Sequence, residues 1–535
     1  MHFIWNRLFL LVPATDQNIP RLGLSHNISS DRRVLTIKLR KGVLWHDETP
    51  FTAKDVKASI LIKYAGGWGD IIRRIKTPDD YTVIFEMREQ IGAIDEKIIF
   101  NDRIMAPYHI FGKITDRIEK IMEEDDRKMT GPQKEKSAAI FEKKAEIMQE
   151  IYSFRPSVPI GTGPFKFSFV TGSDFGLKKF KKGFEAKKIS IDEIRILKNV
   201  SNDITWAYLI GGAIDVTHPA TLQDVTEQIL KLNPKTRLIL PSDYGEFGFV
   251  FNTKKYPLSD IRFRKALAYG VKKDNIRLIS YYYSKTVSNY NTGVLHSLSD
   301  RWLDKSDLDK MTSYDYNPEK THQILKEMGF SIDKEGFYLK PNGLPLKLTI
   351  AGFAGRSDWV LGCEGLVSQL RKLHIRAEIK TYEGALFHQR LAANKFDIAA
   401  NFGADYRAYA HPLTTFERYF GNGAYIKSAS GMPDQVKYHD GTTLSFKKEL
   451  HVLNKAREPG LIKKTVGKLA WAANEYLPFL SIYEKNLMIF VVDGKRVKGW
   501  PSPEDPIWSA SSAGMESVFA YLISTGIVRS VKEYR

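Results

Sequence analysis

Cysteine is nearly absent from this chain of 535 residues, since Cys363 is the only one. An internal disulfide needs two sulfurs and a thiolate-rich metal site needs several, so the sequence excludes both. Cys363 stands between Gly362 and Glu364 and follows the apolar residues 359–361. A lone thiol in this setting is typically a small buried residue, and we do not expect it to act as a nucleophile.

Long apolar runs are also missing. No window of the sequence approaches the roughly 20 consecutive apolar residues that cross a bilayer. Residues 1–14 contain a short apolar stretch, but Arg7 interrupts that stretch instead of preceding it. A secretory signal carries its positive charge ahead of the apolar run, so no signal peptide is visible in this chain.

Catalytic and metal-binding motifs are a third absence. The sequence has no His-Glu-x-x-His, no Gly-x-Ser-x-Gly and no recognisable pairing of cysteine with histidine. Its 12 histidines show no compact ligand spacing. His46, Asp47 and Glu48 are adjacent, but neighbouring side chains on a turn point in different directions. We therefore expect no catalytic residue, no metal site and no cofactor, and a hydrolase is only an alternative.

Positive charge is in excess, with 80 lysines and arginines against 62 acids and a formal net charge of +18. The lysines are scattered, and the densest groups, residues 134–144 and 178–182, lack the interleaved aromatic platforms on which single-strand binders stack bases. We expect a basic solvated surface and no nucleic-acid binding. Binding to nucleic acid or to an anionic membrane surface is an alternative that one contiguous basic groove would favour.

Hydrophobic residues make up 43% of the chain, which is enough to fill large cores. A chain of this length exceeds one hydrophobic core, so two or three packed units are expected. Alternation of apolar and polar residues predicts strands at 35–40 and 81–87. Thr52 and Asp55 have the spacing of a capping box, so a helix is predicted to begin there.

Charge and glycine mark two further segments. Dense charge with spaced apolar residues over 115–152 predicts a solvated helical hairpin with a break at 131–132. Gly161 and Gly163 are predicted to adopt backbone angles closed to other residues, and Pro164 to fix the start of a strand. Strand and helix segments alternate through the rest, which indicates α/β units and not a barrel or a bundle.

One long ordered run carries a resemblance to a known family. Residues 35–47 read Leu-Thr-Ile-Lys-Leu-Arg-Lys-Gly-Val-Leu-Trp-His-Asp, and residues 49–56 read Thr-Pro-Phe-Thr-Ala-Lys-Asp-Val. This run resembles the signature of the family 5 extracellular solute-binding proteins, which include oligopeptide, dipeptide and nickel binders. Further stretches match the family in the same order along the chain, at 161–165, 212–216, 251–253, 260–269, 314–320 and 477–483.

The resemblance implies an α/β, two-lobed periplasmic-binding-protein-like fold with an extra α+β subdomain on the first lobe and a ligand cleft between the lobes. We expect 1–158 to form the extra subdomain, 159–250 the core of lobe 1, 251–484 lobe 2, and 485–535 the return to lobe 1. Residues 4–8 resemble the inside of the family's first helix, so the front of the chain is expected to be truncated.

Residues 396–406, a predicted strand running into a loop, are the best candidate for ligand chemistry. They resemble the family's Ala-Asp-Tyr element, whose aspartate receives the α-ammonium group of the peptide in oligopeptide and dipeptide binders. A carboxylate in a water-poor cleft suits that role, whereas without the resemblance an aspartate after a strand is commonly a turn or cap residue. The predicted ligand-binding residues are Asp405, Tyr406, Arg407, Tyr409 and His411.

The function that the resemblance implies is solute capture for an ABC importer, without catalysis. A di- or oligopeptide would be bound by closure of the lobes and delivered to the permease subunits of the transporter. We expect a monomer at the periplasmic or extracellular face of the membrane, attached through the permease or through a missing N-terminal anchor. Relatives with the same fold bind oligosaccharides and nickel chelates, so these solutes are alternatives to a peptide.

Overall fold

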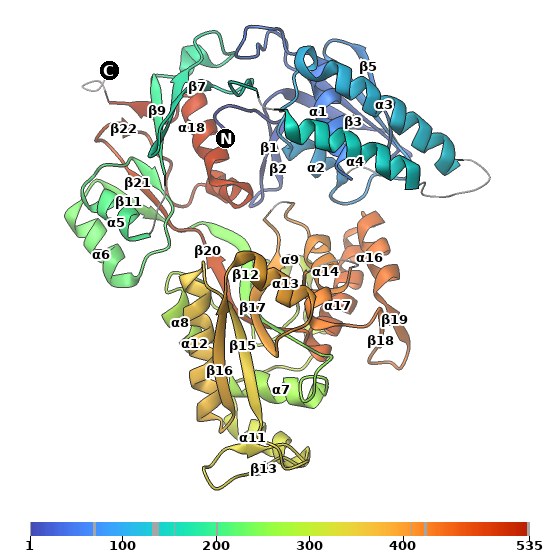
Figure 1. Cartoon of the computed structure of the whole chain (residues 1–535), viewed down its shortest axis with the longest axis vertical. Helices are drawn as coiled ribbons and strands as arrows, with labels where there is room; N and C mark the ends of the chain where they lie inside the picture. Colours follow the sequence, from blue (N-terminus) through green and yellow to red (C-terminus); the bar gives the residue numbers. More distant parts are fainter. Residues whose placement is uncertain are drawn as a thin grey trace. The chain divides into compact units, whose positions relative to one another are not determined.

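The chain folds into two compact α/β units, seen in a computed structural model that describes residues 2–67, 71–130, 138–154, 156–198, 202–407, 409–421 and 425–531 (Figure 1). Unit 1 consists of Met1–Thr217, Ile229–Leu238 and Phe490–Arg535, and unit 2 of His218–Gln228 and Ile239–Ile489. The predicted α/β class is confirmed. Across the described part of the chain, no helix combines the length and apolar character that a bilayer crossing requires.

The main sheet of unit 1 is antiparallel, with strand order β3-β4-β6-β5. Its strands are β3 (Gly23–Ile28), β4 (Val34–Leu39), β5 (Ile72–Asp79) and β6 (Thr82–Met87). β4 and β6 are the two strands predicted from period-two alternation. In β4 the alternating residues Leu35, Ile37 and Leu39 are buried, so one face of the strand meets the core.

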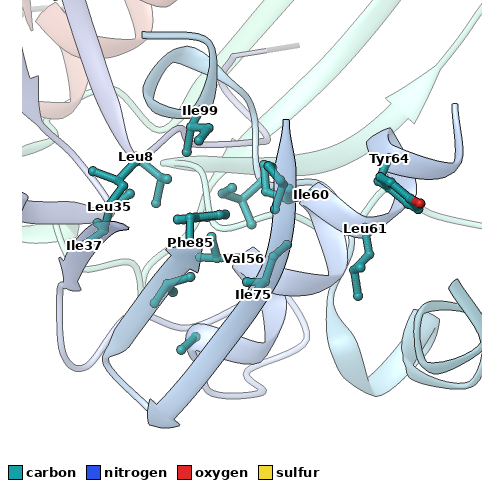
Figure 2. Close-up of a cluster of buried hydrophobic side chains, with 14 of the residues drawn as sticks. Leu8, Leu35, Ile37, Val56, Ile60, Leu61, Tyr64, Ile75, Phe85 and Ile99 are labelled. Carbon is teal, nitrogen blue, oxygen red and sulfur yellow. The ribbon is translucent and has the colours of Figure 1, made fainter. Parts of the chain in front are cut away.

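The core of unit 1 lies between this sheet and helix α1 (Ala53–Ala65). Figure 2 shows Phe85 of β6 and Ile75 of β5 lying close to Val56 and Ile60 of α1, and Leu35 of β4 is the register partner of Phe85. None of these five side chains is more than 3% exposed. The apolar positions of α1 therefore face the sheet, and their burial supplies most of the stabilisation of this packing.

Helix α1 begins where the sequence predicts, after the N-cap residue Thr52. One carboxylate oxygen of Asp55 accepts the Thr52 backbone N–H at 2.6 Å, and the other accepts the Tyr108 N–H at 2.7 Å. Tyr108 is the first residue of α3 (Tyr108–Thr130), which is followed by α4 (Ala138–Ser153). These helices confirm the predicted hairpin, while its predicted break at 131–132 lies outside the described residues.

Two predictions at the front of unit 1 were wrong. Residues 4–8 form no helix, because their backbone groups form hydrogen bonds with distant segments. Gly163 N donates to Ile4 O at 2.7 Å, and the backbone of Arg7 forms an isolated antiparallel β-bridge with that of Arg103. Gly161 and Gly163 do not have positive φ. A Cβ on Gly161 would lie 1.9 Å from Ile4 O, so the glycines provide room for a crossing backbone.

Unit 1 contains further helices and strands. The helices are α2 (Asp95–Asn101), α5 (Asn202–Ile210), α18 (Met515–Ser524), η1 (Ala186–Lys188) and η3 (Pro506–Ala513), and α6 (Gln223–Leu232) crosses the unit boundary. The strands are β1 (Phe9–Val12), β2 (Gln17–Pro20), β7 (Phe165–Val170), β8 (Asp174–Lys179), β9 (Glu193–Leu197), β10 (Val216–Thr217), β11 (Thr236–Ile239), β21 (Ile489–Val492), β22 (Val497–Lys498) and β23 (Arg529–Ser530). They pair as β1-β2, β7-β8-β9, β10-β21-β11 and β22-β23.

Unit 2 is built on a mixed sheet with strand order β16-β15-β17-β12-β20. The strands are β12 (Ser242–Phe251), β15 (Lys347–Phe353), β16 (Arg376–Tyr382), β17 (Ile398–Asp405) and β20 (Phe479–Asn486). Helix α12 (Ser357–Lys372) and helix α13 (Gly384–Ala392) both contact the strands β15 and β16 (Figure 1). Every residue of β20 is buried, as expected for a strand covered on both faces. Cys363 of α12 is fully buried, as predicted.

Further helices and short strands complete unit 2. The helices are α7 (Ile261–Gly270), α8 (Lys273–Ser280), η2 (His296–Leu298), α9 (Ser299–Trp302), α10 (Lys305–Leu308), α11 (Pro318–Glu327), α14 (Pro412–Phe420), α15 (Tyr425–Ser430), α16 (Phe446–Lys455) and α17 (Pro459–Tyr476). The strands are β13 (Ser331–Ile332), β14 (Tyr338–Leu339), β18 (Gln435–Lys437) and β19 (Thr443–Ser445), paired as two short hairpins.

Candidate functional site

The candidate site lies at one end of the unit 2 sheet. β15 runs parallel to β16 and β17, and β12 runs antiparallel to both β17 and β20. The carboxyl ends of β15, β16, β17 and β20 therefore share one edge of the sheet with the beginning of β12. Ligands of open α/β sheets bind outside the carboxyl ends of the strands, so this edge is the place to look for a site.

Asp405, the last residue of β17, lies at this edge and is bound by an arginine two residues later. Arg407 Nε donates to Asp405 Oδ1 at 3.0 Å, and Arg407 Nη2 donates to Oδ2 at 2.6 Å. The Arg407 backbone N–H also donates to Oδ1 at 3.2 Å. The carboxylate predicted to receive a ligand ammonium thus forms a two-pronged ion pair within its own loop.

A second arginine and a threonine hold Asp405 from helix α14. Arg418 Nη1 lies 3.6 Å from Asp405 Oδ2, and the Asp405 N–H donates to Thr415 Oγ1 at 2.9 Å. Burial alone would raise the pKa of Asp405, but the hydrogen bonds and charge of Arg407, together with Arg418, hold it below its ordinary value. Asp405 is therefore ionised, and the positive charges of Arg407 and Arg418 already compensate its negative charge.

The other predicted ligand residues lie in the same loop with different environments. Tyr406 is fully buried, and its N–H donates to Tyr244 O at 2.8 Å. Tyr409 is half-buried. His411 is the N-cap of α14, where its Nδ1 accepts the Leu413 N–H at 3.2 Å. A ligand contact by any of these residues stays a prediction, and His411 has a capping role that the sequence did not indicate.

Four charged residues that the sequence analysis missed lie at the same edge: Asp243, Arg356, Asp358 and Lys485. Asp358 Oδ2 lies 3.5 Å from Lys485 Nζ, and Asp358 Oδ1 lies 3.4 Å from Arg356 Nε. Asp243, Asp358 and Lys485 are each at most 8% exposed. The sequence offered a signal for two of them, because Asp243 precedes and Lys485 follows a mostly apolar stretch of sequence, and a charge at such a boundary can close a buried strand or line a site.

Aromatic rings line the charges. The Arg407 and Arg356 guanidiniums lie 4.6 Å and 5.0 Å from the centroid of Phe402, and Lys485 Nζ lies 4.8 Å from the centroid of Tyr281. Ring faces attract cations, so these contacts help to hold the positive side chains in a fixed arrangement. An edge of paired charges and aromatic rings can bind a polar or zwitterionic solute.

Two buried glutamates lie one step deeper in the sheet. Glu246 of β12 and Glu484 of β20 are directly opposite in register, and both are at most 3% exposed. Glu246 Oε2 accepts the Ala404 N–H at 3.1 Å, while Glu484 accepts the Ser297 N–H at 3.1 Å. Burial raises the pKa of Glu246 to about 7, with the charge of Glu484 adding to the effect.

Comparison with known proteins gives a family match over most of the chain. A family model described as bacterial extracellular solute-binding proteins, family 5 middle, matches residues 17–426. The dipeptide-binding protein of Escherichia coli strain K12 is 25% identical over 412 residues, covering 72% of this chain and 68% of that protein. The glutathione-binding protein of Pectobacterium atrosepticum is 25% identical over 313 residues, and the match spans about half of its length, 52%.

A solved structure with the same fold extends the likeness to nearly the whole chain. The periplasmic oligopeptide-binding protein of an oligopeptide ABC transporter from Thermotoga maritima, crystallised with mannohexaose, has a TM-score of 0.73 with this chain at 23% identity. The match covers 99% of this chain and 94% of that one. At this level of identity the likeness shows a shared fold.

Proposed function

The chain belongs to the family 5 bacterial extracellular solute-binding proteins, and from this premise we propose that it captures a peptide for an ABC importer. The observation that carries the proposal is the family match over residues 17–426. The relatives named for a dipeptide and for glutathione favour a peptide as the solute. Binding without catalysis is the activity that these relatives support.

The geometry of unit 2 supports a binding role. Asp405, Arg407, Asp358 and Lys485 form ion pairs at the carboxyl ends of the strands, where α/β proteins bind ligands. A peptide carries an ammonium, a carboxylate and amide groups, which such paired charges and aromatic rings can bind together. Asp405 as the acceptor of the ammonium stays a prediction from the resemblance, as does the placement of the ligand between two lobes.

The proposal includes the partners and the location of the protein. We infer that the bound peptide is delivered to the permease subunits of the transporter on the outer side of the cytoplasmic membrane, as the family's description as extracellular implies. Neither the hydrolase nor the nucleic-acid alternative gains support from the relatives named above.

Native mass spectrometry of the purified protein, followed by thermal unfolding with a mixed library of di- to pentapeptides, tests the proposal. We expect co-purified peptide masses or a rise in Tm, because a ligand present at 100 times its Kd stabilises the native state by about 2.7 kcal/mol. Oligosaccharides and a nickel-histidine chelate serve as comparison solutes. A shift with one of these solutes and none with the peptides would overturn the peptide assignment and keep the transport role.

A further inference from the structure

Asp243 differs from the other two carboxylates at the end of the unit 2 sheet. Asp358 has Arg356 and Lys485 as ion-pair partners, and Asp405 has Arg407 and Arg418. Asp243 is 6% exposed, and within the described ranges of the chain no hydrogen-bond donor or cation lies within bonding distance of its carboxylate. A carboxylate that is mostly withdrawn from water and has no protein partner is costly, and the small exposed part of Asp243 leaves it open to a ligand.

A β-bulge in β12 positions the Asp243 side chain. Ser242 pairs with Asn486 and Glu246 pairs with Glu484, so three residues of β12 oppose the single residue Lys485 of β20. In this bulge Tyr244 has a φ of 53°, which is strained for a tyrosine, and its N–H donates to Ser242 Oγ at 3.2 Å. Bulges re-aim side chains next to binding sites, and this one presents Asp243 beside Arg407.

The surrounding charges do not satisfy Asp243. Burial raises its pKa, and the charges of Lys485 and Arg407 oppose that rise without cancelling it. Arg407 already gives two nitrogens to Asp405, and Lys485 is paired with Asp358. The protein's own nearby cations are therefore committed elsewhere, while Asp243 is left with unused acceptor capacity.

We propose that Asp243 binds the cationic group of the ligand, an ammonium or a guanidinium, and that Asp405 serves to fix Arg407. This inference rests on the proposed function and names the carboxylate that recognises the peptide. An incoming cation would form a charge-assisted hydrogen bond with a carboxylate that is only 6% exposed, and such a bond is stronger where little water competes for it. The ligand thus supplies the partner that Asp243 lacks.

The test compares binding of a mixed di- to pentapeptide library with binding of the same library after N-acetylation. Titration calorimetry at pH 7.5 is applied to the wild type, Asp243→Asn, Asp405→Asn and Asp434→Asn, a control whose side chain is 82% exposed. We expect Asp243→Asn to weaken binding of the free-amine library about tenfold or more and to abolish its advantage over the acetylated library. The control should keep that advantage in full, and Asp405→Asn should keep part of it, because an Arg407 released from Asp405 can compete with the ligand cation for Asp243.

A second readout separates ligand recognition from a structural role. Asp243→Asn removes an unpaired buried charge, so it should raise the Tm of the ligand-free protein, whereas loss of a structural ion pair would lower it. An unchanged advantage of free-amine peptides in Asp243→Asn would overturn the inference, as would loss of that advantage in Asp405→Asn alone. Absence of any peptide binding by the wild type would overturn the proposed function itself.

Discussion

At the scale of single residues, Arg407 limits how far Asp405 is available to a ligand. The family resemblance identified Asp405 by its position, and the structure places it at the end of the sheet as a strand-terminating residue. Its two oxygens are already bound by Arg407, a residue whose charge the sequence shows but whose direction it does not. A ligand cation at Asp405 would have to compete with a guanidinium held two residues away.

A titration prediction belongs to Glu246. Its folded pKa of about 7 lies above the ordinary 4.5, so the native state binds an additional proton between these pH values. The native state is then favoured at low pH, and this contribution to the unfolding free energy is lost as pH rises through about 7. We expect the loss to reach about 3 kcal/mol between pH 4.5 and pH 8.

Urea unfolding of Glu246→Gln at pH 5 and pH 8 checks this prediction. Glutamine keeps an oxygen for the Ala404 N–H but carries no charge. The variant should be more stable than the wild type at pH 8 and close to it at pH 5. Glu335 has a side chain that is 76% exposed, so the control variant Glu335→Gln should have the same unfolding free energy as the wild type at both pH values. Equal stability differences at the two pH values would show that Glu246 titrates normally.

At the scale of elements, local sequence signals fixed where several helices begin. Thr52 precedes α1, Asp260 accepts the Arg262 N–H at 2.9 Å at the start of α7, and Asn317 accepts the Lys320 N–H at 2.9 Å at the start of α11. Each cap satisfies an N–H group that the helix itself cannot. Because capping depends on neighbours within three or four residues, it can be predicted from the sequence.

Asp55 also joins two helices, which local sequence could not show. It is 2% exposed, and its carboxylate accepts N–H groups at the starts of both α1 and α3. Asp55→Ala should lower the unfolding free energy of unit 1 by about 2–4 kcal/mol, since two partly buried N–H donors lose their acceptor. Chemical denaturation measures the loss, and Glu123→Ala on the exposed face of α3 provides the control. A change within about 0.5 kcal/mol would show that water replaces the carboxylate.

At the scale of the whole molecule, one buried residue in each unit, His46 in unit 1 and Glu246 in unit 2, is predicted to make the stability around it depend on pH, in opposite directions. His46 of unit 1 is 9% exposed, its Nδ1 accepts the Gly161 N–H at 3.3 Å, and its Nε2 lies 3.1 Å from Gly163 O. Burial lowers the pKa of His46 to about 4. Between this value and the ordinary 6.5 the unfolded state binds one more proton than the native state. The contribution of His46 to the unfolding free energy is therefore present above about pH 6.5 and is lost as pH falls toward 4.

Hydrogen exchange measured by mass spectrometry at pH 5 and pH 7.5, corrected for intrinsic rates, distinguishes the two units. Amides of β7 in unit 1 should lose protection at pH 5, and amides of β12 in unit 2 should lose protection at pH 7.5. His46→Gln should reduce the first effect and leave the second unchanged. A uniform change across both units would contradict the prediction.

The sequence by itself determined the α/β class, the strands β4 and β6, the start of helix α1 and the family. These features depend on alternation, capping and ordered motifs, which are written in residues close together along the chain. Only the tertiary structure decided which charges meet. Asp243, Asp358, Asp405 and Lys485 come from β12, α12, β17 and β20, and the order of the strands in the sheet brings them to one edge. Pairing between distant segments depends on strand order and on a bulge in β12, and neither has a local signal in the sequence.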